Sequence, residues 1–254
     1  MTGYPLSLAV TNQMAPVPRR IRAYVGGRVI LDTTSAVYVW EWPKYPQYYI
    51  PIADIDASVL VDENHDQKLS RGTARRHGLR VGDISRPGAL RVYGVDSIPG
   101  LNGMARLEWD AVDAWFEEDE QVFVHPRDPY TRVDALRSTR HVRVELDGVV
   151  LADTTSPVLV FETGLPTRFY INRTDVVFGH LEWSDTVSAC PYKGTTSGYW
   201  TALIGERVYK DLAWTYAFPT RQLLPITGLI AFYNEKVDTI VDGVLLERPV
   251  THFA

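Results

Sequence analysis

The sequence has little of what would place it in several large classes of protein. Its 254 residues include a single cysteine, Cys190, so no internal disulfide can form. No apolar run approaches the roughly 20 residues that a membrane-spanning helix needs. The N-terminal residues also lack the charged start and continuous apolar core of a signal peptide. We therefore expect a protein of the reducing cytoplasm that has no membrane partner.

Basic charge is scarce as well. Lysine and arginine total 26 residues against 31 aspartates and glutamates, which gives a net charge of −5. No long basic run offers a stripe for phosphate groups, so we expect no nucleic acid partner. The nearest basic cluster, Arg71 to Arg80, is typical of a solvated loop or helix face.

Common catalytic and metal-binding motifs are missing. The chain contains no GxGxxG, GxSxG, HExxH or GxxxxGK[ST] pattern, which counts against dinucleotide enzymes, α/β-hydrolases, zinc proteases and P-loop proteins. One cysteine and six scattered histidines provide no CxxC or HxxxH ligand pair. The sequence therefore predicts neither a metal site nor a cofactor.

The chain does contain an internal repeat. Shifting the sequence by 121 positions places many residues of the first half on identical residues of the second: Arg22, Gly27, Val29, Asp32, Thr33, Thr34, Ser35, Val37, Val39, Glu41, Tyr49, Ile50 and Asp54. We interpret the chain as a tandem duplication. The predicted parts are a leader (1–19), a first copy (20–130) and a second copy (131–254). A weaker register aligns Val112 and Asp113 with Val237 and Asp238, which places Trp115 opposite Ile240.

The hydrophobic pattern is that of β-structure. Residues 21–55 begin with alternating Val, Ile, Tyr and Trp around Gly26-Gly27, which predicts a hairpin. Similar alternation recurs throughout both copies, whereas helical periodicity is confined to a turn or two near Arg71 to Gly78 and Trp109 to Ala114. We predict an all-β protein with minor helical content.

Several segments resemble those of the bacterial and fungal domain-of-unknown-function 427 proteins. The segments that carry the resemblance are WFEEDE (115–120), HPRDPYTRVD (125–134), LDGVVLADT (146–154), ETGLPTRFYI (162–171), CPYKG (190–194), AWTY (213–216) and IAFYNEKVD (230–238). The resemblance implies a compact domain of two antiparallel sheets that lean together like a tent, present here twice. The first copy lacks CPYKG and has Ser85 to Gly88 at about that place.

Cys190 and Lys193 are the candidate catalytic residues. A nearby ammonium lowers the pKa of a thiol and raises its thiolate fraction, and Pro191 stiffens the loop between the two. The competing interpretation is that Cys190 is a small buried hydrophobic residue, because free cysteine is among the most buried residue types.

An aromatic ligand pocket is predicted around this stretch. Aromatic side chains beside a glycine-rich loop can line an apolar pocket with a polar rim, although each can equally be ordinary core. The predicted ligand-binding residues are Tyr192, Tyr199, Trp200, Trp214, Tyr216, Arg168, Tyr170 and Glu162. The recurrence of Glu162 as Glu41 in the first copy also favours a role in the fold, such as pairing with a buried cation.

The connector between the copies is expected to be stiff and extended, because Pro126 and Pro129 forbid a helix. We interpret its polar side chains as an interdomain clamp, with acid–base work as the alternative: His125, Arg127, Asp128 and Arg132.

The resulting functional hypothesis is a small-molecule-binding protein, whose enzyme form would use Cys190 as a thiolate. One alternative is a non-catalytic structural or interaction module of either monomeric or oligomeric state. A second alternative is a nucleotidyltransferase-like enzyme, a label that some classifications attach to the resembled family, although the residues here do not supply that chemistry.

Overall fold

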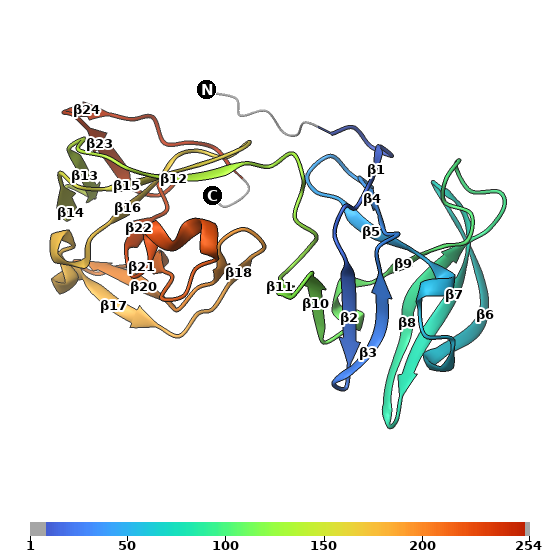
Figure 1. Ribbon diagram of the computed structural model, residues 1–254. Coiled ribbons are helices and arrows are strands. Elements are labelled where there is room, and N and C mark those ends of the chain that lie inside the picture. The colour runs from blue at the N-terminus through green and yellow to red at the C-terminus, as the bar shows by residue number, and fades with distance from the viewer. Residues whose placement is uncertain (1–8, 252–254) are drawn as a thin grey trace. The chain divides into compact units, whose positions relative to one another are not determined.

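The computed structural model describes residues 9–251, and almost all of its regular structure is β-strand (Figure 1). The described chain divides between Asp128 and Pro129 into two compact units, which we treat separately. No helix among the described residues reaches seven residues, and every helical element is a short 3-10 turn. The prediction of an all-β fold with minor helical content is confirmed.

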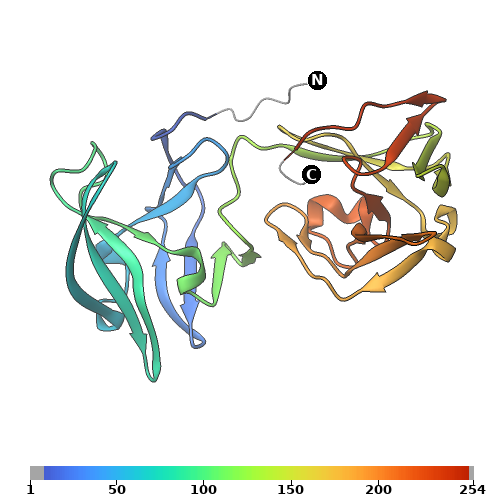
Figure 2. The ribbon, with the colours of Figure 1, turned by 180° about the vertical axis from the view of Figure 1, so that it is seen from behind.

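The first unit contains two antiparallel sheets. The larger has the strand order β1-β4-β5-β9-β8-β7-β6 and the smaller has the order β11-β10-β2-β3. The long strands β6, β7 and β8 are visible from behind in Figure 2 as the teal and green segments. The strands are β1 (Met14–Pro16), β2 (Ile21–Val25), β3 (Arg28–Thr33), β4 (Val37–Val39), β5 (Gln47–Pro51), β6 (Leu60–Leu69), β7 (Gly72–Val81), β8 (Ile84–Tyr93), β9 (Met104–Leu107), β10 (Ala114–Glu117) and β11 (Glu120–Val122).

The second unit repeats this arrangement. Its larger sheet has the order β12-β15-β16-β22-β21-β20-β17 and its smaller sheet the order β14-β13-β23-β24. The strands are β12 (Val133–Arg137), β13 (Val142–Leu146), β14 (Val149–Thr154), β15 (Val158–Glu162), β16 (Arg168–Ile171), β17 (Leu181–Ser184), β20 (Gly198–Ile204), β21 (Arg207–Thr215), β22 (Ile230–Phe232), β23 (Asp238–Val241) and β24 (Val244–Leu245). Strand for strand, both sheets have the connectivity of the first unit, as a duplication requires.

The first hairpin of each unit has the same turn geometry. Gly26 and Gly27 both have positive φ, and so do Asp147 and Gly148 at the matching turn of the second unit. Two consecutive positive φ angles match the right-handed twist of a two-residue hairpin, which explains the preference for Gly and Asp there. Each hairpin also has a bulge at the same point, after Ala23 in the first unit and after Val144 in the second.

The larger sheet of the second unit buries both of its faces. One face packs against the smaller sheet and contributes residues such as Phe169, Ile171 and Ala213 to the main core. The opposite face carries the alternate residues, including Tyr170 and Trp214, under the 3-10 segment η6 (Arg221–Ile226). Successive side chains of a strand point to opposite faces, so neighbouring residues enter different clusters. We call these two faces the inner and the outer face.

Two details differ from the sequence-based expectations. Arg71 to Gly78 is not helical, because Gly72–Val81 pairs with strands on both sides as β7, whereas the turn at Trp109 is present as η3 (Trp109–Ala111). Residues 1–8 of the predicted leader lie outside the described residues, and Met14–Pro16 forms the edge strand β1.

The weaker register of the repeat holds at β9 and β22, where Arg106 and Ala231 pair with equivalent residues, but it is wrong by one position at Trp115. Trp115 pairs with Ala23, and Thr239 pairs with Val144, the residue 121 positions after Ala23. Trp115 therefore corresponds to Thr239 and not to Ile240. The turn before this strand is one residue shorter in the second unit, which shifts the alignment of everything after it.

Candidate functional site

Cys190 and Lys193 lie on a small hairpin that is inserted between β17 and β20. The hairpin consists of β18 (Ala189–Cys190) and β19 (Gly194–Thr195), and Cys190 pairs directly with Gly194. The three loop residues are Pro191 to Lys193, and Gly194 has a φ of +94°, a conformation that favours glycine. CPYKG is thus the sequence of a tight three-residue turn.

Hydrogen bonds hold this hairpin to the rest of the unit. The amide of Thr220 donates to the carbonyl of Lys193 at 3.0 Å, and the Thr220 hydroxyl donates to the carbonyl of Tyr192 at 2.5 Å. The Ser188 and Tyr199 hydroxyls are 2.6 Å apart. Because the loop carbonyls are satisfied by Thr220, the turn is fixed and the direction of the Lys193 side chain is set.

Lys193 is buried and joins the thiol to a carboxylate. Its ammonium forms an ion pair with Glu162 at the end of β15, and the Lys193 and Glu162 side chains are 10% and 9% exposed. The same Nζ lies 3.9 Å from Sγ of Cys190, a half-buried residue. Burial by itself lowers the pKa of Lys193, but the Coulombic effects of Cys190 and Glu162 outweigh it and raise the pKa. Lys193 is therefore held as a cation beside the thiol.

Tyrosines complete the surroundings of this group. Trp214 Nε1 donates to the Tyr170 hydroxyl at 3.2 Å. Burial raises the pKa of Tyr170 to about 12, with Lys193 acting in the opposite direction. Burial, with the charges of Tyr170 and Cys190, raises the pKa of Tyr216 well above its usual value. These phenols stay neutral at physiological pH and can act as hydrogen-bond donors.

The residues predicted to form an aromatic pocket are mostly packed. Tyr170, Tyr199, Trp214 and Tyr216 belong to the cluster on the outer face, where η6 covers them. Trp200 lies on the inner face in the main core, and Tyr192 is half-buried in the hairpin loop. The structure thus brings most of the set together as a buried cluster beside Lys193, with Trp200 on the other side of the sheet.

Arg168 occupies a second buried ion pair that the sequence did not reveal. Its guanidinium donates to both carboxylate oxygens of Glu235, at 2.5 and 2.6 Å, and also to Asn234 Oδ1. The cation lies over the rings of Trp214 and Tyr233, at 5.8 and 5.7 Å from their centroids. Burial opposes the charged form of Glu235, but hydrogen bonds from Arg168 and Thr251 dominate and lower its pKa. In the sequence, this ion pair could have been suspected from the polar residues Asn234 and Glu235, which closely follow the buried strand β22.

The residues of the predicted clamp make contacts inside their own units. In the first unit, the His125 ring stacks on Tyr45 with centroids 3.8 Å apart, and buried Asp128 accepts from Trp40 Nε1 at 3.0 Å. Arg127 lies 3.6 Å from Glu120. In the second unit, Arg132 pairs with Asp134 at 2.8 Å. A role between the copies stays a prediction.

The first unit has a counterpart of the Lys193–Glu162 pair without the thiol. Glu41, which corresponds to Glu162, lies 3.6 Å from Arg71 and 3.3 Å from Arg106, and it accepts from Tyr49 at 2.8 Å. Arg71 sits between β6 and β7, where the second unit inserts the Cys190 hairpin. The predicted placement of Ser85 to Gly88 opposite CPYKG is wrong, because those residues lie on β8 and not in this connection. In both copies this connection supplies a cation, Arg71 or Lys193, to the equivalent carboxylate, and only the second copy adds a thiol.

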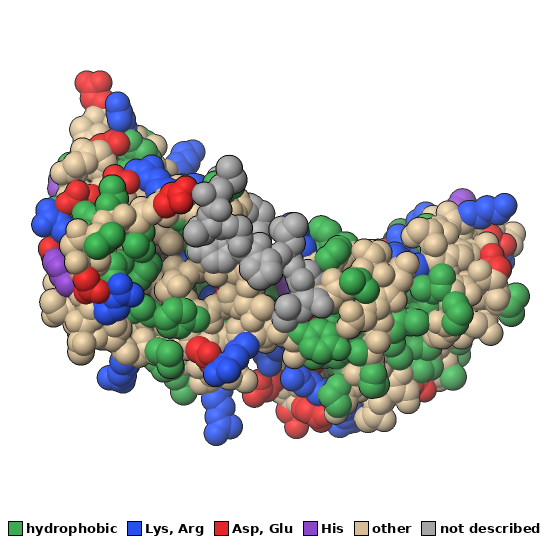
Figure 3. All heavy atoms as spheres, turned by 90° about the horizontal axis from the view of Figure 1, so that it is seen from above, with side chains coloured by type: hydrophobic (Ala, Val, Ile, Leu, Met, Phe, Trp, Pro, Cys, Tyr) green, Lys and Arg blue, Asp and Glu red, His purple; other side chains and the backbone are tan. Residues whose placement is uncertain are grey.

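Three general features of the described residues are the distribution of surface charge, the arrangement of metal-binding side chains and the length of the helices. On the face drawn in Figure 3, the Lys and Arg side chains are interspersed with Asp and Glu side chains. Within residues 9–251, no three His, Cys, Asp or Glu side chains are arranged to hold a metal ion. In the same part of the chain, no helix is long and apolar enough to cross a bilayer.

Comparisons with known proteins identify the repeated domain. A family model with the description "Domain of unknown function (DUF427)" matches residues 13–118 and again residues 134–243. Each match falls on one of the two units, and together they cover most of the chain. A search of curated proteins found no match.

Proposed function

The chain belongs to the family described as domain of unknown function 427, in two copies, and from that premise we propose that its second unit binds a small molecule beside Cys190 and reacts with it through the thiolate. The observation that carries the proposal is the buried ammonium of Lys193, 3.9 Å from Sγ. A cation held at this distance favours the thiolate, which is the nucleophilic form of cysteine. Cys190 itself is half-buried, so a reactant can reach it.

The proposed chemistry is nucleophilic attack on an electrophilic carbon. The Cys190 thiolate forms a C–S bond while the bond from that carbon to its leaving group breaks, and the leaving group keeps the electron pair. Lys193, with its Nζ 3.9 Å from Sγ, is a proton donor for that group. Glu162 positions the ammonium, since its carboxylate is ion-paired with it from β15.

Alkylation of the single thiol tests the proposal. The ammonium–thiolate attraction at 3.9 Å amounts to about 4 kcal/mol at an effective dielectric constant of about 20, and the Glu162 carboxylate offsets part of it. If about 1.4 kcal/mol of this attraction remains in the transition state of the thiol's attack, the alkylation rate changes about tenfold. We therefore expect Lys193→Met to slow the reaction of Cys190 with iodoacetamide about tenfold near neutral pH, measured by mass spectrometry.

Two matched variants serve as controls for charge. Lys193→Arg keeps the cation and should react within about threefold of the natural protein. Glu162→Gln keeps Lys193 but removes the offsetting carboxylate, so alkylation should not slow. An unchanged rate in Lys193→Met, in protein shown to be folded, would contradict the proposal.

A non-catalytic structural module is the second candidate, and the first unit favours it. There the equivalent carboxylate, Glu41, is half-buried among Arg71, Arg106 and Tyr49 with no thiol present. In this alternative the Lys193–Glu162 pair only stabilises the outer face of the sheet. It predicts that Lys193→Met lowers stability but leaves the alkylation rate of Cys190 unchanged.

A further inference from the structure

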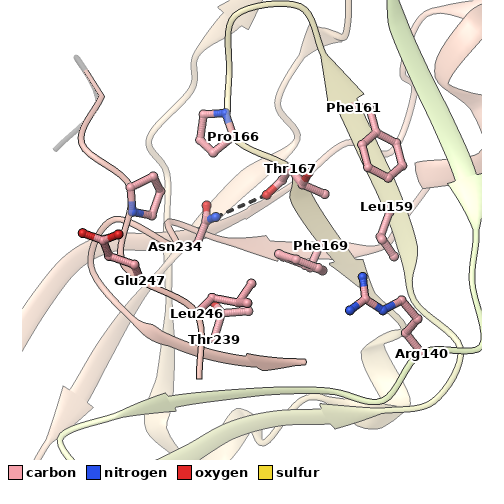
Figure 4. Close-up of a pocket in the computed structure, with 11 residues that line it drawn as sticks. Arg140, Leu159, Phe161, Pro166, Thr167, Phe169, Asn234, Thr239, Leu246 and Glu247 are labelled. Atoms are coloured by element: carbon pink, nitrogen blue, oxygen red, sulfur yellow. Dashed lines mark hydrogen bonds between the residues drawn. The ribbon is translucent and has the colours of Figure 1, made fainter. Parts of the chain in front are cut away.

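The second unit contains a cavity of about 180 Å³ that is separate from the Cys190 site. Leu159 and Phe169 line it from the inner face of the larger sheet, and Thr239 lines it from the smaller sheet. Figure 4 shows the labelled side chains around a central space, with Phe161 and Arg140 on one side and Leu246, Asn234 and Glu247 on the other. None of the residues predicted to bind a ligand lines this cavity.

The first unit fills the same place with aromatic rings. The offset of 121 residues pairs Leu159 and Phe169 with Tyr38 and Tyr48, and each pair is matched across its own two strands. The same offset pairs Phe161 with Trp40. Thr239 corresponds to Trp115, because both lie opposite equivalent residues of the neighbouring strand.

These four rings pack on one another in the first unit. Tyr38 stacks on Tyr48 with centroids 5.8 Å apart and contacts Trp40 at 5.9 Å, and Tyr48 contacts Trp115 at 5.6 Å. All four are buried in the core. At every one of these positions the second unit has a smaller side chain, and the largest reduction is from an indole to the threonine at 239.

The cavity has the size and access of a ligand site. A protein cavity of about 150 Å³ binds benzene, so about 180 Å³ is large enough for one ring or a small fused pair, and here the lining combines apolar side chains with Arg140, Asn234 and Glu247. Thr239, Leu159 and Phe169 are at least 91% buried, whereas Phe161 is 41% exposed. The cavity therefore has a closed end and an end that reaches the surface at Phe161.

The polar groups of the first unit indicate how such a ring would be oriented. There, Tyr48 donates to Glu117 at 2.6 Å, Trp40 donates to Asp128 at 3.0 Å, and Trp115 Nε1 donates to the Trp109 carbonyl at 3.1 Å. Three of the four buried rings thus give their N–H or O–H to an oxygen acceptor. The lining of the cavity in the second unit includes the buried Thr239 hydroxyl and, at the surface, the Glu247 carboxylate, whose two oxygens together have several lone-pair sites.

We propose that this cavity binds a planar aromatic molecule of about the size of indole that carries an N–H or O–H donor, in the place that Trp115 fills in the first unit. The ligand would complete a ring cluster that the second copy lacks. The inference is independent of the chemistry proposed at Cys190, because the cavity lies on the inner face of the larger sheet and the Lys193 group on the outer face.

Titration of the intact chain with indole, followed by ligand-detected nuclear magnetic resonance, tests this inference. We expect saturable binding to the natural protein and at least a tenfold loss of affinity in Thr239→Trp, which supplies the indole from the protein itself. Thr239→Val has nearly the same volume and no ring, and it should retain binding within about fivefold. Cyclohexanol, which is not planar, should compete poorly with indole.

Two further variants keep the result interpretable. If circular dichroism shows that Thr239→Trp does not fold, Leu159→Tyr introduces the ring of the first copy at another wall and should weaken indole binding in the same way. Cys190→Ser should bind indole as the natural protein does, which separates this site from the thiol site. The absence of saturable binding at millimolar indole, or equal affinity in the natural protein and the ring-bearing variant, would overturn the proposal.

Discussion

Replacing Lys193 by methionine removes a buried cation while keeping most of the apolar stem. The variant leaves the Glu162 carboxylate, 9% exposed, without its ion-pair partner. Breaking a buried ion pair from one side costs about 3–5 kcal/mol, mostly because the remaining charge is desolvated and unpaired. We expect a loss of that size in the free energy of opening of the second unit.

A second substitution, Glu162→Gln, completes a double-mutant cycle and removes the carboxylate charge that Lys193→Met leaves unpaired. Replacing a whole buried pair by uncharged groups of similar size is often close to neutral. The double variant Lys193→Met with Glu162→Gln should therefore recover about 2–3 kcal/mol of the loss. The coupling energy of the pair follows once the effect of the Glu162→Gln single variant is measured as well.

Hydrogen exchange with mass spectrometry is the suitable assay, because two units need not unfold in one transition. Peptides from β20 and β21 report on the second unit, and peptides from β7 and β8 report on the first. Arg71→Met is the matched control in the first unit. Its effect should be smaller, since Glu41 keeps Arg106 at 3.3 Å and Tyr49 at 2.8 Å.

The reasoning would be refuted by a Lys193→Met variant whose second unit opens within about 1 kcal/mol of the natural value, because typical costs of breaking a buried pair exceed that. A double variant as unstable as the single one would also refute it. In that case the effect of Lys193 would come from packing and not from charge.

Two further predictions concern other parts of the fold. Arg168→Met should destabilise the second unit by about 3–5 kcal/mol. The pKa of Glu235 is lower in the folded protein, so the stability that this carboxylate contributes is fully present above its unfolded pKa of about 4.3 and is lost as the pH falls through its folded pKa. Acid titration of the natural protein would show this loss. Gly72→Ala should lower the melting temperature of the first unit more than Gly27→Ala does. A Cβ at Gly72 would lie 2.4 Å from Ser97 Cα, whereas nothing lies within 4 Å of a Cβ at Gly27. Equal decreases in melting temperature would contradict this steric argument.

Much of the fold could be predicted because it depends on local patterns. Period-2 alternation marks strands wherever one face of a sheet is buried, and Gly26-Gly27 and Asp147-Gly148 mark hairpin turns through their positive φ angles. The helical assignment at Arg71 to Gly78 failed because a basic, glycine-containing segment has no strong period, and its strand is stabilised by pairing with β6 and β8.

The candidate site could be predicted only in part. Cys190 and Lys193 are three residues apart, so a short loop was enough to bring them together. The partners Glu162 and Glu235 are 31 and 67 residues from Lys193 and Arg168, distances along the chain at which composition carries no pairing information. Four of the aromatic residues, Tyr170, Tyr199, Trp214 and Tyr216, lie in one cluster, but whether aromatic side chains line a space or fill it depends on what packs above them, here η6.

The sequence by itself determined the β-class, the duplication and the family, because each of these is written in the order and spacing of residues along one chain. Only the tertiary structure decided that Lys193 is a buried cation beside Cys190, that Arg71 lies beside the equivalent carboxylate in the first copy, and that the second copy leaves a cavity where the first has rings. These features depend on which side chains from distant strands meet on one face, and on how much of the shared volume they fill.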